Sequence, residues 1–427
     1  MKNYVKKILA LIIGGCMVFS GVGCNKGGNS SSSTKTEKTL VLPTENEFIS
    51  FSTWNDDMFE AYIRPYWYSR EIYNETVVFI GEEGEAPLMY EPTEVNTVRS
   101  YDLLTDYVDG KDYVIEGRKI KRVKGSSMPY WEPDEYFLTA PNSTSVVINV
   151  NHSTIDEGLD MDYSVQRFLR YAEGTVFTSK QVAVTYRTNE LYDGVLPKGQ
   201  REKVADFVNK VEAGQDVNIM IYGPSTGVGC NASGTSYGGN INPYMPAFYD
   251  ILVKYIEKTY NIKVNLMNEA VGGWTSKDLV SNYDKKIKGK EIDLMFFVCP
   301  GSNDSRTGKD SYSANLFLIF QKFFNDYPEA NLIVQTPSIP NEQSTWVGDT
   351  RKMPNWVEEV VAESVDNDRI AISRVDEIYS WMNGKGKKGR DLLANNINHF
   401  ADFALRVYVQ CALKAIFGND YVEEIYE

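Results

Sequence analysis

The chain contains only two histidines, His152 and His399, so few residues could act as a general base. His399 lies in "NNINHFADF", where a loop enters a predicted helix near the end of the chain. Ser225 lies in "IYGPSTGVG", directly after an apolar run that ends in a glycine. A serine beside a base can attack a carbonyl carbon, provided that hydrogen-bond donors hold the oxyanion that forms. Ser225 and His399 therefore make acyl transfer the first chemistry to consider.

Two further segments offer groups that could hold an oxyanion. "NEAVGGWTS" contains two adjacent glycines, and a glycine lets a backbone N–H approach a ligand closely. "PGSND" offers the side-chain amide of Asn303. We predict that the backbone N–H groups of Ser225 and Gly273, together with the Asn303 amide, form an oxyanion hole.

The elements that must position these residues alternate between strands and helices from about residue 217 onward. Apolar runs predict buried strands at 217–223, 263–270, 292–299, 331–337 and 369–375. Apolar residues at helical spacing predict helices at 244–260, 276–289, 314–327, 355–365 and 400–417. Such alternation is typical of a three-layer α/β fold, in which helices cover both faces of a mostly parallel sheet. Ligands of such sheets bind beyond the carboxyl ends of the strands, which is where Ser225, Gly273 and Asn303 fall.

The earlier part of the chain has a different pattern. Short alternating runs at 76–81, 112–123, 145–150 and 181–188 are separated by Gly, Pro, Asn and Asp, which predicts antiparallel strands. We predict a β-sandwich (jelly-roll-like) domain over 41–195, a linker helix within 196–215 and the α/β domain over 216–427. The aromatic run "RPYWYSREIY" (64–73) is interpreted as core and interdomain packing, with a sugar-binding platform as the alternative.

The order of these segments resembles the SGNH (GDSL-type) hydrolase superfamily. "GPSTGVG", "GGWTS", "GSND" and "NINH" are similar to its four sequence blocks, and the likeness covers about residues 216–418. The resemblance implies a flavodoxin-like domain with Ser225 as nucleophile, His399 as base, and Gly273 and Asn303 as oxyanion donors. A β-sandwich before such a domain resembles the family-2 carbohydrate esterases, which implies an acylated carbohydrate or polysaccharide as substrate.

Two positions depart from the pattern of that superfamily. Pro224 stands where the family has an aspartate that supports the loop around the serine. A proline fixes φ and removes one N–H, so it stiffens this turn. Asn396 stands where the family has an aspartate, three residues before His399. The Asn396 oxygen could accept the Nδ1–H of His399, and Asp391 and Asp402 are alternative acceptors.

Two tryptophans are candidates for contact with substrate. Trp274 follows the oxyanion glycine and could form a wall of the acyl pocket or pack in the core. Trp346 lies in the loop at 336–351 and could stack on a sugar ring. We predict no metal or cofactor, because the two histidines are far apart and the cysteines do not cluster. The segment "GVGCNASG" also lacks the lysine of a phosphate-binding loop.

The first residues have the pattern of an export signal. Three lysines precede an apolar stretch at 8–22, which ends in "GVGC" and is followed by a polar Gly/Ser/Lys-rich tether. This pattern resembles bacterial lipoproteins and implies lipidation of Cys24, with Cys16 as a rival. We predict a signal peptide over 1–23, a tether over 24–40 and a lipid-anchored protein at the extracellular face of the membrane. Ordinary secretion or an uncleaved anchor are the alternatives.

The leading expectation is a serine esterase that removes small acyl groups, with acetyl favoured, from carbohydrate. One alternative is a non-catalytic carbohydrate-binding lipoprotein on a degenerate scaffold. The other is an acyltransferase that acts on surface polysaccharide. The net charge of −14 argues against a nucleic-acid partner, because phosphates are held by basic surfaces.

Overall fold

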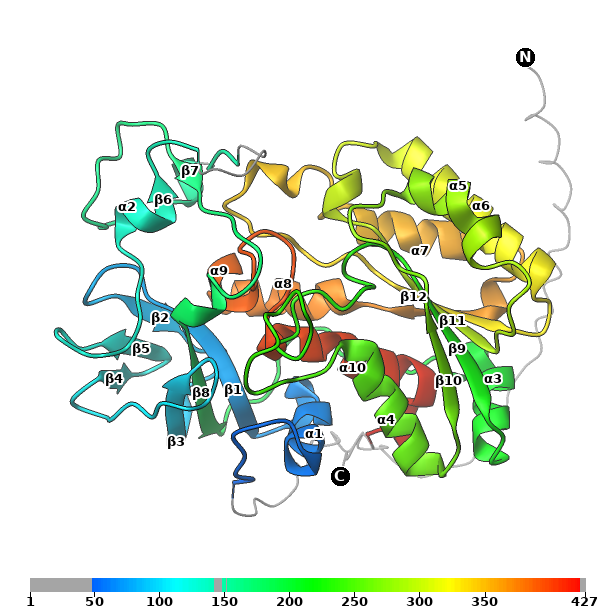
Figure 1. The fold of residues 1–427 in the computed structure, drawn as a ribbon, viewed down its shortest axis with the longest axis horizontal. Coiled ribbons are helices and arrows are strands. Elements are labelled where there is room, and N and C mark those ends of the chain that lie inside the picture. Colours follow the sequence, from blue (N-terminus) through cyan, green and yellow to red (C-terminus); the bar gives the residue numbers. More distant parts are fainter. Residues whose placement is uncertain (1–47, 142–147, 151, 423–427) are drawn as a thin grey trace, which may run out of the picture. The chain divides into compact units, whose positions relative to one another are not determined.

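Two kinds of structure follow one another along the chain (Figure 1). In the computed structural model, residues 48–422 are described, apart from 142–147 and 151. Antiparallel strands occupy the part up to residue 188, and strands that alternate with helices begin at residue 217. The predicted signal peptide, tether and Cys24 lie outside the described residues. Within the described part, no helix combines the length and apolar character that a membrane crossing requires.

The second kind of structure contains one parallel sheet of five strands, in the order β10-β9-β11-β12-β13. Numbered along the sheet's own strands, this is the order 2-1-3-4-5 of doubly wound, flavodoxin-like folds. The predicted three-layer α/β fold is therefore confirmed. The strands are β9 (Val217–Tyr222), β10 (Val264–Asn268), β11 (Leu294–Val298), β12 (Asn331–Gln335) and β13 (Ile370–Ser373).

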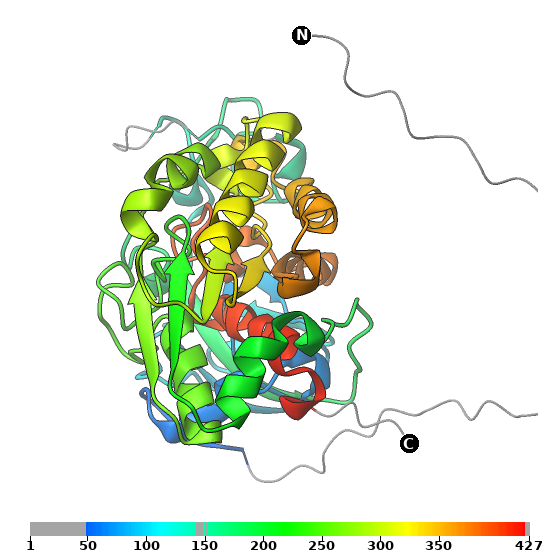
Figure 2. The same ribbon diagram turned by 90° about the vertical axis from the view of Figure 1, so that its right-hand side faces the viewer.

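Helices cover both faces of this sheet (Figure 2). Side chains alternate between the two faces along each strand. Met220 and Phe297 pack in one core with α5, α6 and α7, whereas the ring of Phe296 lies 5.4 Å from that of Phe248 on α4, across the other face. The helices of this part are α3 (Ala205–Glu212), α4 (Phe248–Tyr260), α5 (Ser276–Lys286), α6 (Lys309–Asp326), α7 (Met353–Glu363), α8 (Val375–Gly384), α9 (Gly389–Leu392) and α10 (Asp402–Phe417).

Within the α/β part, the structure differs from the predicted elements in two places. Helices α8 and α9 were not predicted, and the first residue of α8, Val375, was assigned to the preceding strand. Helix α4 begins at Phe248, so the segment at 223–247 is a long loop of turns, and Ser225 does not stand on a direct strand-to-helix turn. Side chains of this long loop contact other residues of the site.

The first kind of structure is antiparallel, as predicted. Its strands pair as β1-β8-β3, as β2-β5-β4 and as β6-β7, and the hairpin β4–β5 turns at Gly117 and Arg118. Two helices, α1 (Asp56–Ile63) and α2 (Pro133–Tyr136), accompany the strands. The strands are β1 (Glu71–Val78), β2 (Glu85–Pro87), β3 (Pro92–Ser100), β4 (Tyr113–Glu116), β5 (Lys119–Arg122), β6 (Phe137–Leu138), β7 (Phe168–Leu169) and β8 (Gln181–Thr188).

The aromatic run at 64–73 packs in the interior. Tyr66, Trp67 and Tyr68 are all buried, and the Tyr66 hydroxyl donates to the carbonyl oxygen of Phe403 at 2.6 Å. The guanidinium of Arg406 on α10 lies 5.1 Å from the centre of the Tyr66 ring. The interpretation of this run as packing between the two parts of the chain is confirmed.

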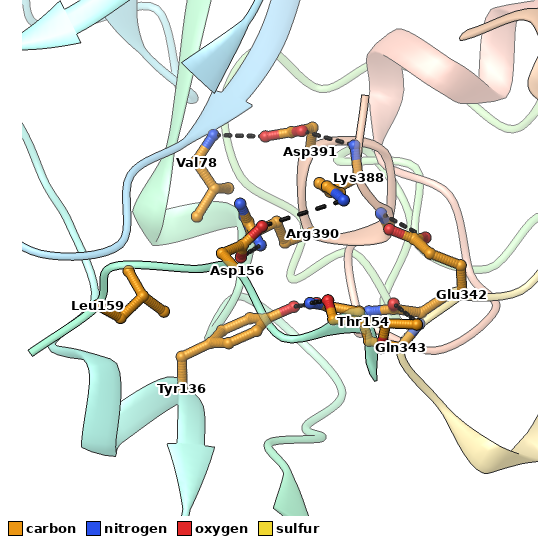
Figure 3. A network of polar contacts seen from close by, with 12 residues as sticks. Val78, Tyr136, Thr154, Asp156, Leu159, Glu342, Gln343, Lys388, Arg390 and Asp391 are labelled. Carbon is orange, nitrogen blue, oxygen red and sulfur yellow. Dashed lines mark hydrogen bonds and ion pairs between the residues drawn. The ribbon is translucent and has the colours of Figure 1, made fainter. Parts of the chain in front are cut away.

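The segment that leads to His399 is tied to the antiparallel part by polar contacts (Figure 3). Asp391 on α9 accepts hydrogen bonds from the backbone N–H of Val78 at 2.8 Å and of Lys388 at 2.8 Å. Arg390, on the same helix, forms an ion pair with Asp156 at 2.6 Å. These contacts fix the start of the loop that carries His399.

Candidate active site

Ser225 lies in a tight turn that begins directly after β9. The carbonyl oxygen of Pro224 accepts hydrogen bonds from the N–H groups of Gly227 at 2.9 Å and Val228 at 3.2 Å. A Cβ atom on Gly223 would lie 2.6 Å from the carbonyl oxygen of Val298 at the end of β11. Only a glycine permits this approach of β9 and β11, and Pro224 then starts the turn that displays the serine.

Ser225 and His399 are brought together. The Nε2 atom of His399 lies 2.9 Å from Ser225 Oγ, and each residue is 8% exposed. His399 ends a short loop before α10, and its carbonyl oxygen accepts the N–H of Ala394 at 2.7 Å. A serine hydroxyl and an imidazole at hydrogen-bond distance are the arrangement that nucleophilic acyl transfer needs.

The glycine turn after β10 lies beside the serine. A Cβ atom on Gly272 would lie 3.9 Å from Ser225 Cβ, and the N–H of Val271 donates to Gly223 O at 3.0 Å. Gly273 has a φ of +78°, which glycine adopts without strain. None of the described residues accepts a hydrogen bond from the N–H of Ser225 or Gly273. Both N–H groups are therefore free of partners among the described residues.

Asn303 comes from the third strand end and lines the same small pocket as Ser225. Its Nδ2 donates to the carbonyl oxygen of Trp274 at 2.9 Å, so one of the two amide hydrogens is held and the other remains. The neighbouring Asp304 accepts the N–H of Ser276 at 2.7 Å and its hydroxyl at 2.9 Å. Burial raises the pKa of Asp304. These bonds join the strand end of β11 to the glycine turn.

The pocket at Ser225 is small, and its lining is mixed polar and apolar. Its volume is about 10 Å³, which is room for about one water molecule. The residues that line it are Pro224, Ser225, Thr226, Cys299, Gly301, Ser302, Asn303, Ser338 and Asn398. Hydroxyl and amide side chains therefore surround the serine on the open side.

Asn396 does not take the place expected for it. Its backbone has a φ of +66°, which turns the side chain to other partners. Its oxygen accepts from the Tyr136 hydroxyl at 2.9 Å and from Asn341 at 2.9 Å, and its Nδ2 donates to the Arg170 carbonyl oxygen at 2.9 Å. None of the described contacts of Asn396 is with the ring of His399. Its hydrogen bonds instead connect separate loops.

The two alternative carboxylates also have other partners. Asp391 accepts the backbone N–H groups described above, and Asp402 accepts the N–H of Ser233 at 2.8 Å. Burial raises the pKa of Asp402 to about 6. Neither carboxylate contacts the His399 ring among the described hydrogen bonds.

The group that faces Nδ1 of His399 is the carboxylate of Glu173, at 3.3 Å from its Oε2 atom. Glu173 belongs to the antiparallel part, between β7 and β8. It stands in "YAEGT", which matches no motif, and 226 positions separate it from His399. No signal in the sequence pointed to it.

Burial alone would raise the pKa of Glu173, but its contacts more than offset this effect. Hydrogen bonds and charge interaction with His399, and hydrogen bonds from Asn395 and Tyr171, lower the pKa of Glu173 to about 2. The side chain is 38% exposed, so water shares in its stabilisation. The carboxylate is ionised throughout the neutral range.

The two tryptophans lie in different surroundings. Trp274 packs against the core beneath α5, α6 and α7, and Lys286 lies 6.0 Å from its ring. Trp346 packs against the apolar cluster of the antiparallel part. Neither tryptophan lines the pocket at Ser225. No group of three or more His, Cys, Asp and Glu residues is placed to hold a metal within the part of the chain described.

Comparison with known proteins finds likeness in fold alone. No family model and no curated protein matches the chain. An acetylxylan esterase from Geobacillus stearothermophilus is 16% identical with a TM-score of 0.38, over 48% of this chain and 96% of that one. A two-domain esterase active on acetylated mannans is 14% identical with a TM-score of 0.41, over 55% of this chain and 57% of that one. An alpha/beta hydrolase enzyme from the metagenome of Lake Arreo, Spain, is 16% identical with a TM-score of 0.37, over 47% of this chain and 95% of that one. Likeness at this level carries no argument about activity.

Proposed function

We propose that this chain is a serine esterase that removes small acyl groups, above all acetyl, from carbohydrate. The observation that carries the proposal is the 2.9 Å contact between Ser225 Oγ and His399 Nε2. It lies at a strand edge where Gly273 and Asn303 also offer donors. A nucleophile, a base and oxyanion donors at one place are what ester hydrolysis through an acyl-enzyme requires.

The reaction follows from these groups. Ser225 Oγ attacks the ester carbonyl carbon while His399 Nε2 takes the hydroxyl proton. The N–H groups of Ser225 and Gly273 and the Asn303 amide hold the negative oxygen of the tetrahedral intermediate. The C–O bond to the alcohol then breaks, and His399 returns the proton to the departing oxygen. Water repeats these steps on the acyl-enzyme and releases the carboxylic acid and free Ser225.

The proposed substrate class rests on the pocket. The small size of the pocket favours a small acyl group. Thr226, Ser302 and Asn398 offer hydroxyl and amide groups at the rim, which suit the hydroxyl groups of a sugar. The resemblance of the two-part architecture, an antiparallel part before an α/β part, to family-2 carbohydrate esterases supports the same class.

We extend the proposal to the site of action. The "GVGC" segment and the polar tether support attachment of the protein to the outer face of the cell membrane through a lipid on Cys24. A Cys24→Ser variant is expected to move from the membrane fraction to the soluble fraction. Unchanged fractionation of that variant would contradict lipidation at Cys24.

The test of the function compares acetate release from an acetylated oligosaccharide by the wild type and by Ser225→Ala. We expect kcat to fall by at least about 10⁴-fold in Ser225→Ala. The matched control is Ser281→Ala, which removes an exposed serine hydroxyl on α5 and should leave the rate unchanged. Equal rates for wild type and Ser225→Ala would overturn the proposal. Transfer of the acetyl group to an added sugar in place of water would redefine it as a transferase.

A further inference from the structure

The carboxylate of Glu173 is held from several sides at once. Its Oε1 atom accepts hydrogen bonds from the Tyr171 hydroxyl at 2.8 Å and from Asn395 Nδ2 at 3.0 Å. Its Oε2 atom accepts from Asn231 Nδ2 at 3.2 Å and faces His399 Nδ1 at 3.3 Å. Three donors and the Nδ1 atom of His399 thus converge on two oxygens, which suits an ionised carboxylate, because both of its oxygens accept.

We propose that Glu173 is the positioning carboxylate of a Glu-Ser-His triad, an inference that rests on the proposed esterase function. Glu173 acts through His399 and does not touch the reacting atoms. An ionised carboxylate only accepts, so Nδ1 of His399 carries the hydrogen and Nε2 is left free to take the proton of Ser225. The geometry therefore fixes the tautomer that the reaction needs.

The same contact stabilises the charged form of the base. When Nε2 takes the proton of Ser225, the imidazole becomes a cation, and the negative charge of Glu173 stands 3.3 Å from Nδ1. Glu173 takes no proton in this step, because its pKa is about 2. The proton goes on from Nε2 to the departing alcohol.

Asn395 joins this carboxylate to the backbone of the base. Its side-chain oxygen accepts the N–H of His399 at 3.0 Å, and its Nδ2 donates to Glu173. Asn395 is fully buried. One amide side chain thus sets the position of the His399 main chain and of the group that faces its ring.

Through Glu173, the antiparallel part of the chain takes part in positioning the base. Glu173 precedes β8, whereas Ser225 and His399 belong to the α/β part. Asn396, which was expected to accept the Nδ1–H of His399, faces Tyr136. A carboxylate from the first part of the chain thus takes the place that Asn396 leaves.

The test uses Glu173→Gln and Glu173→Asp in the full chain. Glutamine keeps the shape but has one acceptor oxygen in place of two, and it has no charge. We expect Glu173→Gln to lower kcat by about 10²–10⁴-fold with a smaller change in KM. We also expect the rise of kcat/KM with pH to move to lower pH, because a cationic ring is no longer favoured. Glu173→Asp keeps the charge, so its profile should stay near that of the wild type even where kcat falls.

A second measurement does not depend on turnover. With only two histidines in the chain, the ring signals of His399 can be followed by NMR and assigned with a His152→Gln variant. The pH at which the His399 signal is half shifted should fall in Glu173→Gln. The matched control is Glu291→Gln, an exposed glutamate before the amino end of β11, which should change neither measurement.

The outcomes separate the two proposals. A wild-type titration and a wild-type pH profile in Glu173→Gln, alongside an inactive Ser225→Ala, would overturn the triad and leave the esterase. Full activity in Ser225→Ala would overturn the proposed esterase function. The NMR titration would still show whether Glu173 stabilises the cationic form of the His399 ring.

Discussion

His399 Nε2 lies 2.9 Å from Ser225 Oγ, although 174 positions separate the two residues in the sequence. The contact exists because the parallel sheet ends β9 beside the loop that precedes α10. Both side chains are buried, so the hydrogen bond forms with little competition from water. The predictions below test the groups that surround this pair.

Asn303→Ala should slow the reaction with little effect on folding. The amide is expected to hold the oxyanion only as it forms, so its loss should reduce kcat by about 10²–10³-fold. Steady-state kinetics on an acetyl ester measures this change. Asn355→Ala, which removes an exposed amide on α7, is the control and should keep wild-type kinetics. A loss confined to KM would argue against the oxyanion role of Asn303.

Gly223→Ala should destabilise the protein and displace the serine. The new Cβ would lie 2.6 Å from Val298 O and 2.8 Å from Val298 Cβ, so β9 and β11 must move apart. We expect a cost of about 1–3 kcal/mol in the free energy of unfolding, measured in urea. Gly384→Ala, where a Cβ would meet nothing within 4 Å, should not show this loss. Equal stability of the two variants would contradict close packing at Gly223.

Asp402→Asn should change how stability depends on pH. Burial raises the pKa of Asp402 to about 6 in the folded protein, so the folded state holds a proton that the unfolded state releases between about pH 4 and 6. The stabilising contribution is present below pH 4 and is lost as the pH rises through 6. Wild type should therefore gain up to about 3 kcal/mol relative to the variant as the pH falls across this window. Urea unfolding at pH 4.5 and 7.5 measures the difference, and parallel pH dependences would refute the assignment.

Asn396→Gly should affect stability without changing the pH profile of the reaction. Glycine keeps the backbone at a φ of +66° but removes the contacts with Tyr136, Asn341 and the Arg170 carbonyl. The Tyr136 hydroxyl keeps Gln343 and Asn341 Nδ2 keeps the carbonyl oxygen of position 396, so the loss falls mainly on the Arg170 carbonyl oxygen and should cost about 1–3 kcal/mol. Thermal unfolding should therefore occur at lower temperature. If the pH at which kcat/KM rises shifted in Asn396→Gly as far as in Glu173→Gln, Asn396 would again be the candidate partner of His399.

The fold of the α/β part could be predicted because its signals are local. Apolar strands of about five residues alternate with amphipathic helices, and parallel strands place their carboxyl ends at one edge. The positions of Ser225, Gly273 and Asn303 follow from that edge. Helix α8 was missed because only Arg374 separates it from β13, and its first residue, Val375, was assigned to that strand.

The third member of the site could not be predicted, because it depends on contacts between distant segments. Glu173 is one of many acidic residues in the chain, and nothing near it in sequence resembles a catalytic motif. Spacing favoured Asn396, but its left-handed backbone directs the side chain towards Tyr136, and the adjacent Asn395 contacts Glu173 instead. Only the packing of the antiparallel part on the α/β part decides between them.

The most direct test of the proposed nucleophile is covalent labelling of the full-length protein with a fluorophosphonate, followed by mass spectrometry of its peptides. Such probes react with a serine that an adjacent base activates. We predict a single adduct on Ser225, absent in Ser225→Ala and formed far more slowly in His399→Ala. Absence of an adduct on Ser225 in the folded wild type, or equal labelling in His399→Ala, would contradict the account.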